Sequence, residues 1–279
     1  MVAEIKEFDA QHWVKTRSSL DPNESTFLVW NGNVYAFVPC EKKKLLFKIV
    51  GMSVSRCIPT EEGCWNFTSR ELTYYLDPET GEILHKWHNP WTDETVPVMH
   101  VANSPVQGHF KGKFPAPVEA DKTTFVFDIF PTYPNPLGEN SKFAEYSPHT
   151  TYQAAELFKL TVPTADLLNS ELSSVTELRL SWDRIGQWLP WMKMGGHLGH
   201  LIYSAYGSKV NRFSELPQLL QDEINIRIPL YKNAPRSFLD VQDMTSWLYF
   251  QQHFDAYLVG ETFPLPQGEE GGQGVLAQR

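Results

Sequence analysis

Residues 64–102, with the sequence CWNFTSRELTYYLDPETGEILHKWHNPWTDETVPVMHVA, decide the fold class of this chain. Two turn sequences, at residues 77–81 and 89–94, separate runs of apolar and aromatic residues. Each turn has Asp or Asn followed by Pro, a pair in which the Asx side chain starts the turn and Pro fixes φ. Strands joined by such short turns lie beside each other in antiparallel order. The stretch therefore predicts a β-meander.

A second turn signal occurs nearer the N-terminus, at Asn31-Gly32. Asn-Gly between apolar runs is typical of a tight hairpin turn with positive φ, so we expect paired strands at residues 27–30 and 33–38. Further strands are expected at residues 45–49, 125–130, 177–185 and 200–210.

The strand expected at residues 125–130 is apolar apart from Asp128. Such a run is typical of a central strand that is covered on both faces. Prolines are dense around it, from residue 115 to residue 148, and we expect a long loop there that covers the mouth of a cavity.

Helical spacing of apolar residues predicts three helices. The first spans residues 151–168, and the second begins at Ser214 with Pro217 in its first turn. The third begins at Thr245 and carries a stripe of aromatic residues, namely Trp247, Phe250, Phe254 and Tyr257. We expect the two later helices to pack outside the sheet.

Strands dominate the first two thirds of the 279 residues. The pattern predicts a mainly β, antiparallel fold, either a calycin- or lipocalin-like barrel or a strongly bent sheet with a few packed helices. We expect one barrel-like domain with helical decorations over residues 1–263. The Gly-, Gln- and Glu-rich residues 264–279 lack periodicity, and we expect a disordered tail there.

The charge and composition of the chain limit the classes of binding partner that we expect. The excess of 33 acidic over 24 basic residues disfavours binding to nucleic acid or to an anionic membrane surface. No run approaches the roughly 20 apolar residues of a membrane helix, and the N-terminal residues do not resemble a signal peptide, so we expect a cytoplasmic protein. Three cysteines without a CxxC pair imply no disulfide framework. The sequence leaves open whether the protein forms a homodimer.

Strand parity selects Arg184 as a candidate functional residue. In the strand at residues 177–185 it shares a face with Leu178, Leu180 and Trp182, so its guanidinium points inward. A buried guanidinium is unfavourable unless it is paired. It therefore meets either a carboxylate that closes the core or an oxygen of a ligand.

The same parity places His100 on an apolar face with Val96 and Val98. An imidazole in such a position is usually a hydrogen-bonded core residue. An inward histidine together with Arg184 would nevertheless be sufficient for proton transfer and oxyanion stabilisation.

Glu71 shares one strand face with Trp65, Phe67 and Tyr75, so its carboxyl group lies beside aromatic rings. Desolvation of that kind raises the pKa of a carboxyl group. Asp128 is a second candidate partner for Arg184, and either acid is alternatively only a counter-ion.

Residues 188–196 combine two tryptophans, two methionines and a glycine pair. Such a run suits either a core plug or an adaptable apolar wall of a ligand pocket. In the following strand Tyr203 and Tyr206 lie on opposite faces, so one of them faces inward. The pairs His85/His88 and His197/His200 point to opposite faces of strands, and we predict no metal site. Dinucleotide and P-loop fingerprints do not occur, and we expect no cofactor.

Three strings carry a family resemblance: residues 75–82 (YLDPETGE), 100–106 (HVANSPV) and 181–195 (SWDRIGQWLPWMKMG). Together with residues 30–39 they resemble the domain-of-unknown-function family numbered 1838, found in bacteria and fungi. Positions that match the family pattern are Trp87, Asn89, His100, Asn103, Trp182, Arg184, Trp188, Trp191 and Tyr203. The resemblance implies no catalytic assignment. The chain departs from the pattern at residues 196–198, where the family has a charged residue and Pro, so selectivity differs if that loop touches ligand.

We expect a cofactor-independent enzyme of the lyase or isomerase type. It would isomerise, cyclise or dehydrate a small apolar oxygenated metabolite in an aromatic-lined pocket, in secondary-metabolite biosynthesis. The candidate catalytic residues are His100, Arg184, Glu71 and Tyr203, and the candidate substrate-binding residues are Trp65, Phe67, Tyr75, Trp87, Asp128, Trp182, Trp188, Trp191, Met192 and Met194. The alternatives are a non-catalytic binding protein for a hydrophobic ligand and a structural module with a filled interior.

Overall fold

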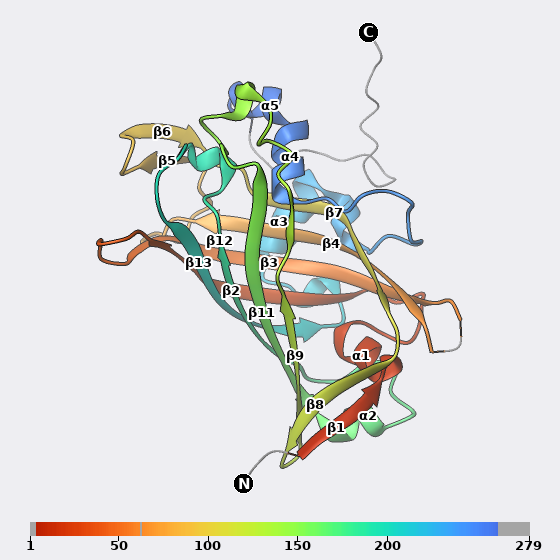
Figure 1. The fold of residues 1–279 in the computed structure, drawn as a ribbon. Helices are drawn as coiled ribbons and strands as arrows, with labels where there is room; N and C mark the ends of the chain where they lie inside the picture. Colours follow the sequence, from red (N-terminus) through yellow and green to blue (C-terminus); the bar gives the residue numbers. More distant parts are fainter. Residues whose placement is uncertain (1–3, 62, 262–279) are drawn as a thin grey trace.

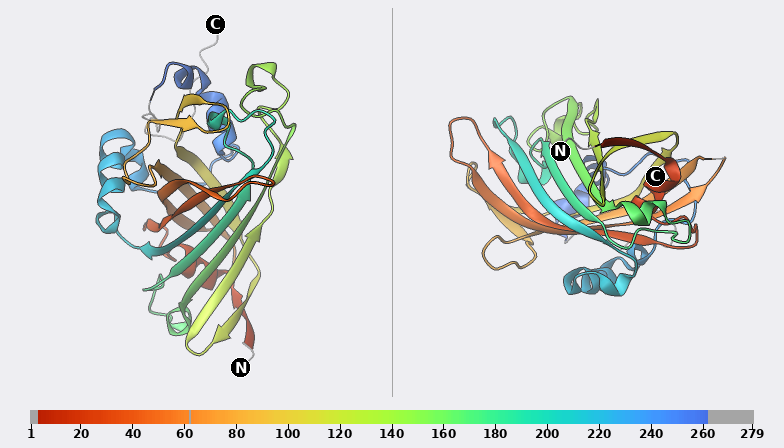
Figure 2. Two further views of the ribbon diagram at one scale, coloured as in Figure 1. Left: turned by 90° about the vertical axis from the view of Figure 1, so that its left-hand side faces the viewer. Right: turned by 90° about the horizontal axis from the view of Figure 1, so that it is seen from below.

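The computed structural model describes residues 4–61 and 63–261, so the tail expected at 264–279 lies outside the described residues. Within the described part, eleven strands form one antiparallel sheet that curls strongly into a half-barrel (Figures 1 and 2). Strands hold 45% of the residues and helices 19%. The mainly β prediction is confirmed, in its form of a strongly bent sheet.

The sheet is built from β1 (Glu4–Asp9), β2 (Thr26–Phe37), β3 (Lys44–Pro59), β4 (Trp65–Leu76), β7 (Val101–Phe110), β8 (Lys113–Glu119), β9 (Lys122–Ile129), β10 (Thr132–Pro134), β11 (Thr151–Pro163), β12 (Arg179–Gly186) and β13 (His200–Val210). A separate hairpin holds β5 (Lys86–Asn89) and β6 (Glu94–Pro97). The helices are α1 (Ala10–Arg17), α2 (Thr164–Leu168), α3 (Gln218–Arg227), α4 (Ser246–Gln252) and α5 (Phe254–Leu258).

One gap interrupts the barrel wall. Neighbouring strands follow the order β1-β8-β9-β11-β12-β13-β2-β3-β4-β7, with β10 beside β11. Strand β8 pairs with β9 at Val118↔Thr123 and Glu119↔Lys122, and its remaining length pairs with β1. Most of β9 therefore faces a gap, and β7 borders that gap from the other end of the sheet. Helix α1 packs against both β7 and β8 there.

The hairpin expected at Asn31-Gly32 is wrong, because β2 runs straight through both residues and pairs with β3 and β13. A Cβ atom at Gly32 would lie 2.6 Å from the Cβ of Ala205 on β13 and 2.5 Å from the Ser204 carbonyl oxygen. Glycine is needed here for the close approach of two strands. The Asn-Gly signal cannot distinguish that need from the positive φ of a turn.

The helix expected at residues 151–168 is also wrong. Residues 151–163 form β11, which is paired on both sides with β9 and β12, and a short helix, α2, follows Pro163. Alternate residues of β11, including Glu156, Phe158 and Leu160, line the interior. The period is therefore two, and pairing on both edges overrides the apparent helical spacing.

The strand at residues 125–130 exists as part of β9, but it is not covered on both faces. Phe125 is buried, whereas residues 126–130 are exposed because the strand borders the gap. Part of the loop expected at residues 115–148 is strand, and its irregular remainder after β10 packs on α4 and α5 through Phe143. That remainder closes the upper end of the half-barrel in Figure 1.

The two later helices form near the expected positions. Helix α3 follows Pro217 and packs on β3 at the convex face of the sheet (Figure 2). Thr245 caps α4 by accepting the N–H of Leu248 at 3.2 Å. The aromatic stripe of α4 and α5 is buried at one end of the half-barrel, beside β7, instead of on the convex face.

Candidate functional site

The concave side of the sheet encloses a cavity of about 580 Å³. This volume lies in the range of pockets that hold one small organic molecule. Aromatic rings supply much of its wall, among them Trp30, Phe67, Phe127, Phe158, Trp182 and Trp247. Two rows of polar side chains line it, one on β11, β12 and β13 and the other on β3, β4 and β7.

The first set is the arginine row, formed by Glu156, Arg184 and Tyr203. These residues lie directly opposite one another on β11, β12 and β13. Nε of Arg184 lies 3.6 Å from a carboxylate oxygen of Glu156, and its guanidinium lies 5.1 Å from the centre of the Tyr203 ring. Nη2 of Arg184 also donates to the hydroxyl of Tyr152 at 2.9 Å. The row fixes the orientation of a guanidinium that is 8% exposed.

Arg184 stays cationic in this setting. Burial acts against its charge, but Tyr152, Tyr203 and Glu156 outweigh that effect, and the net result raises the pKa of Arg184. The hydroxyls of Tyr203 and Tyr75 lie 3.2 Å apart. Burial raises the pKa of both tyrosines, so both remain protonated at neutral pH. The arginine row therefore presents a fixed positive charge beside the phenol hydroxyls of Tyr152 and Tyr203, and Tyr203 meets Tyr75 of β4 from the facing wall.

Gly186 makes room for the guanidinium. A Cβ atom at this position would lie 2.8 Å from Cζ, Nη1 and Nη2 of Arg184. The arginine side chain thus folds back along its own strand over a residue without a side chain. A side chain at residue 186 would displace the guanidinium and would not clash with the backbone of a neighbouring strand.

The second set is the glutamate row, formed by Ser53, Glu71 and Asn103 on β3, β4 and β7. The register of β4 and β7 shifts between Ser69 and Glu71, which is the signature of a β-bulge. The extra residue lies on β7, between Asn103 and Val106, so the alternation of β4 is unbroken and Glu71 lines the cavity together with Asn103.

Arg17, at the end of α1, adds a second guanidinium to this row. It donates to Ser53 Oγ at 3.0 Å and to Ser55 Oγ at 3.2 Å, and it lies 4.8 Å above the Phe67 ring. The end of α1 is held by Lys209, whose ammonium group donates to the carbonyls of Lys15, Thr16 and Ser18. A buried lysine therefore fixes the position of Arg17.

Glu71 is the titratable group of the cavity. Burial and the charge of Glu156 raise the pKa of Glu71 to about 7, although Arg17 and a hydrogen bond from Asn103 act in the opposite direction. The charge of Glu156 on the facing wall is thus the second largest cause of the raised pKa of Glu71, after burial. A carboxyl group with this pKa accepts and donates protons near neutral pH.

The gap in the barrel wall is where the cavity opens to solvent. His109 on β7 and Phe127 and Ile129 on β9 are exposed and also line the cavity. Along the edge of β7 that does not pair with β4, Asp243 accepts the N–H of Gln107 at 3.0 Å, and Met244 donates to the Pro105 carbonyl at 2.9 Å. These residues hold the segment before α4 beside the mouth.

His100 does not belong to the cavity wall, contrary to the expectation from parity. It precedes β7 instead of lying within a strand, so alternation of faces does not apply to it. Its Nδ1 accepts the N–H of Tyr75 at 3.1 Å, and its ring stacks at 6.0 Å on that of Tyr75, which itself lines the cavity. Burial lowers the pKa of His100 to about 3. It is a neutral, hydrogen-bonded core residue.

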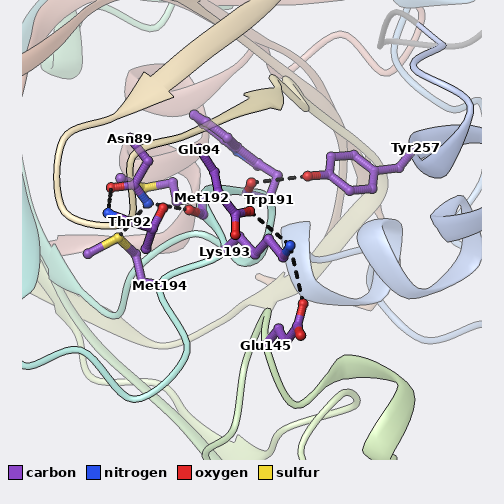
Figure 3. A network of polar contacts seen from close by, with 9 residues as sticks. All are labelled: Asn89, Thr92, Glu94, Glu145, Trp191, Met192, Lys193, Met194 and Tyr257. Carbon is purple, nitrogen blue, oxygen red and sulfur yellow. Dashed lines mark hydrogen bonds and ion pairs between the residues drawn. The ribbon is translucent and has the colours of Figure 1, made fainter.

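The run at residues 188–196 forms a core plug that contacts β6 and α4, and Figure 3 shows its polar contacts. Asn89 donates to the Met192 carbonyl at 2.8 Å, and Tyr257 donates to the Trp191 carbonyl at 3.2 Å. Lys193 has a φ of 55° and pairs with Glu94 at 2.8 Å. Of the two alternatives left open by the sequence, the core plug describes this run.

The predicted site residues divide accordingly. Those that line the cavity are Phe67, Glu71, Tyr75, Trp182, Arg184 and Tyr203. Those that lie elsewhere are Trp65, Trp87, His100, Asp128, Trp188, Trp191, Met192 and Met194. Trp191, within the plug, and Trp87 both pack on the ring of Phe47. Asp128 is exposed and points away from the cavity, so it does not pair with Arg184.

Residues 23–254 match the model of a family described as a protein of unknown function, DUF1838. The chain belongs to this family. The match confirms the resemblance carried by the three strings, and it spans both polar rows except Arg17. No curated protein matches the chain.

Three residues of the site were missed by the interpretation of the sequence: Arg17, Tyr152 and Glu156. Tyr152 and Glu156 lie in the segment predicted as a helix, and reading β11 with period two would have placed Glu156 opposite Arg184. Arg17 enters the site from a helix at the gap, and strand parity cannot predict such a contact.

Proposed function

We propose that this protein is a cofactor-independent enzyme that catalyses proton transfer on a small apolar oxygenated metabolite. One observation carries the proposal. A carboxyl group with a pKa of about 7 lies on one wall of an aromatic cavity, and a permanently charged guanidinium with the phenol hydroxyls of Tyr152 and Tyr203 lies on the other. An isomerisation, a cyclisation or a dehydration needs such a pair of groups.

In this proposal ionised Glu71 removes a proton from a carbon next to a carbonyl group. The electron pair of the broken C–H bond forms a C=C bond, and the π pair of the carbonyl group moves to its oxygen, where Arg184 and Tyr203 stabilise the resulting oxyanion. When the C=O bond re-forms, the C=C electrons either take the proton back from Glu71 at the far carbon of a conjugated C=C bond, which completes an isomerisation, or expel a hydroxyl group from the β carbon, which takes the proton of Glu71 and departs as water. No electrons are lost or gained, so no redox partner is required.

The experiment compares the wild-type protein with Glu71→Gln and with the control Asp128→Asn, whose carboxylate is exposed on the outer surface. Each is incubated with a metabolite extract from cells of the source organism, and the mixture is followed by mass spectrometry. We expect a compound to disappear while an isomer or its dehydrated form accumulates. Glu71→Gln should slow this about 10²- to 10⁴-fold, and Asp128→Asn should not. Equal rates for wild type and Glu71→Gln would exclude the proposal.

A non-catalytic binding protein is the second candidate, and the aromatic cavity favours it as well. The same experiment distinguishes the two, because a bound compound would then be recovered unchanged. The third alternative, a structural module, predicts a filled interior, and a cavity of about 580 Å³ does not match that expectation.

The predictions of cellular location, pathway and oligomeric state remain predictions. In the described part of the chain no helix is long and apolar enough to cross a bilayer. Work in the cytoplasm, in secondary-metabolite biosynthesis and as a homodimer are proposals, as is the absence of a metal or cofactor.

A further inference from the structure

Two guanidiniums, those of Arg17 and Arg184, lie toward opposite ends of the cavity. Arg184 is near α4, because it donates to the hydroxyl of Tyr152, whose ring packs at 4.6 Å on that of Trp247 in α4. Arg17 is the last residue of α1, which lies at the other end of the half-barrel (Figures 1 and 2). Both arginines and Trp247 line the cavity, which therefore extends from α1 to α4.

The two guanidiniums differ in what holds them. Arg184 lies beside the carboxylate of Glu156. Among the described residues no acid forms an ion pair with Arg17, whose nitrogens donate to the uncharged hydroxyls of Ser53 and Ser55. A guanidinium has more N–H donors than these two serines take up. Arg17 therefore keeps both charge and donors for a further partner.

The Arg17 guanidinium lies at the cavity wall. It stands 4.8 Å above the Phe67 ring and donates to Ser53, and both of these residues line the cavity. The Arg17 side chain is partly exposed, whereas Arg184 is 8% exposed. Burial lowers the pKa of Arg17, because protein has replaced much of the water around its charge. A cation in this setting is unfavourable without a counter-ion, and a ligand anion would supply one.

The surroundings of Arg17 are apolar and aromatic. Trp13 lies one turn earlier on α1, and its ring meets that of Phe110 on β7 at 5.9 Å. Both rings line the cavity. An anionic ligand that reaches Arg17 must therefore carry an apolar body. A single guanidinium compensates one negative charge, which favours a carboxylate over a doubly charged phosphate.

We propose that the substrates are apolar carboxylic acids, that the carboxylate binds the Arg17 guanidinium at the α1 end of the cavity, and that the apolar body extends toward Arg184. This inference rests on the proposed function only for the identification of the ligand as the substrate. It goes further by naming the class of substrate and its direction in the cavity.

Four probes with one ring system test the inference by calorimetry on the full chain at pH 7. They are 2-naphthoate, 2-acetylnaphthalene, 2-naphthyl phosphate and the 2-naphthylmethylammonium ion. We expect the naphthoate to bind about tenfold or more tightly than the ketone, which has a similar shape without a charge. The phosphate and the ammonium ion should both bind more weakly than the naphthoate.

Variants of two arginines locate the effect. Arg17→Gln should remove the preference for the naphthoate and leave the affinity for the ketone unchanged, which shows that the cavity is intact. Arg179→Gln is the matched control, because that side chain is 81% exposed beside Glu177, and it should leave the preference intact. A preference that survives Arg17→Gln, equal binding of naphthoate and ketone, tighter binding of the phosphate or the ammonium ion, or no binding of any probe would overturn the inference.

A second measurement needs no change at Arg17. The charges of Glu156 and Asp243 raise the pKa of Glu71, and that of Arg17 lowers it. A carboxylate on Arg17 would offset the lowering, so Glu71 should take up a fraction of a proton when the naphthoate binds at pH 7. Calorimetry in two buffers of different ionisation enthalpy measures the uptake. It should be smaller for the ketone and absent in Glu71→Gln, and no uptake with the naphthoate would contradict binding at Arg17.

The two proposals fail in different ways. The probes report binding alone, so a preference for the carboxylate can hold even if no metabolite is ever converted. Conversely, turnover of an uncharged metabolite that depends on Glu71 and is unaffected by Arg17→Gln would support the acid/base role and contradict the class of substrate.

Discussion

The arginine row and the glutamate row occupy opposite walls of one cavity, yet they are built differently. Glu156, Arg184 and Tyr203 lie in an unbroken ladder of three strands. The glutamate row crosses a register shift beside Glu71 and takes its guanidinium from a helix. The regular ladder holds a charge that is constant with pH, and the irregular one holds a carboxyl group that titrates near neutrality. Permanent and switchable charge are thus separated within one site.

Among changes to the arginine row, the largest expected effect comes from removing the permanent charge. Arg184→Gln should reduce turnover about 10²- to 10³-fold, because the oxyanion loses its main stabilising group. It should also lower the free energy of unfolding by about 3–5 kcal/mol, since Glu156 remains without its ion-pair partner. Steady-state kinetics and denaturant unfolding check both values. Arg184→Lys, which keeps the charge, should lose less activity, and equal losses would show that charge is not what this wall supplies.

A smaller effect is expected from moving the guanidinium without removing it. Gly186→Ala places a methyl group where the Arg184 guanidinium now lies, and the flexible side chain must shift. We expect turnover to fall about 10- to 100-fold, while the free energy of unfolding changes by less than about 1 kcal/mol.

Gly196→Ala is the matched control for that variant, because no atom lies within 4 Å of a Cβ at that position. In a Gly186→Ala/Arg184→Gln double variant the first change should add nothing, since it acts through the arginine. Additive losses would separate Gly186 from Arg184.

The smallest effect concerns stability and pH. Because the pKa of Glu71 is raised to about 7 in the fold, the native state keeps a proton that the unfolded chain releases near pH 4.5. This contribution to stability is complete below about pH 4.5 and is lost as pH rises through about 7. Between pH 5 and pH 8 the wild type should lose on the order of 1–3 kcal/mol that Glu71→Gln does not lose. Urea unfolding at both pH values measures the difference, and parallel behaviour of the two proteins would contradict it.

The residues that face the cavity could be predicted from the sequence on strands whose side chains alternate regularly. Parity on β12 placed Trp182 and Arg184 inside the cavity, and parity on β4 placed Phe67, Glu71 and Tyr75 there. It could not predict what depends on distant contacts.

Three failures of the sequence reasoning share one physical cause. Gly32 was taken for a turn although it serves a close strand contact, β11 was taken for a helix, and His100 was placed on a strand face although it lies before the strand. In each position, tertiary packing decides the conformation and the local pattern does not. Arg17 reaches the cavity because α1 packs against β7 and β8 at the gap in the barrel wall.

The most direct test of the difference between the two walls is a titration of the Glu71 carboxyl group by carbon-13 NMR. Glutamate is labelled at the side-chain carboxyl, and the Glu71 signal is assigned by its loss in Glu71→Gln. We predict a midpoint near pH 7 that moves down in Glu156→Gln, because the charge of Glu156 is one cause of the raised value. A midpoint near pH 4.5, unchanged by Glu156→Gln, would show that Glu71 titrates as an ordinary solvated carboxyl group and would contradict the account.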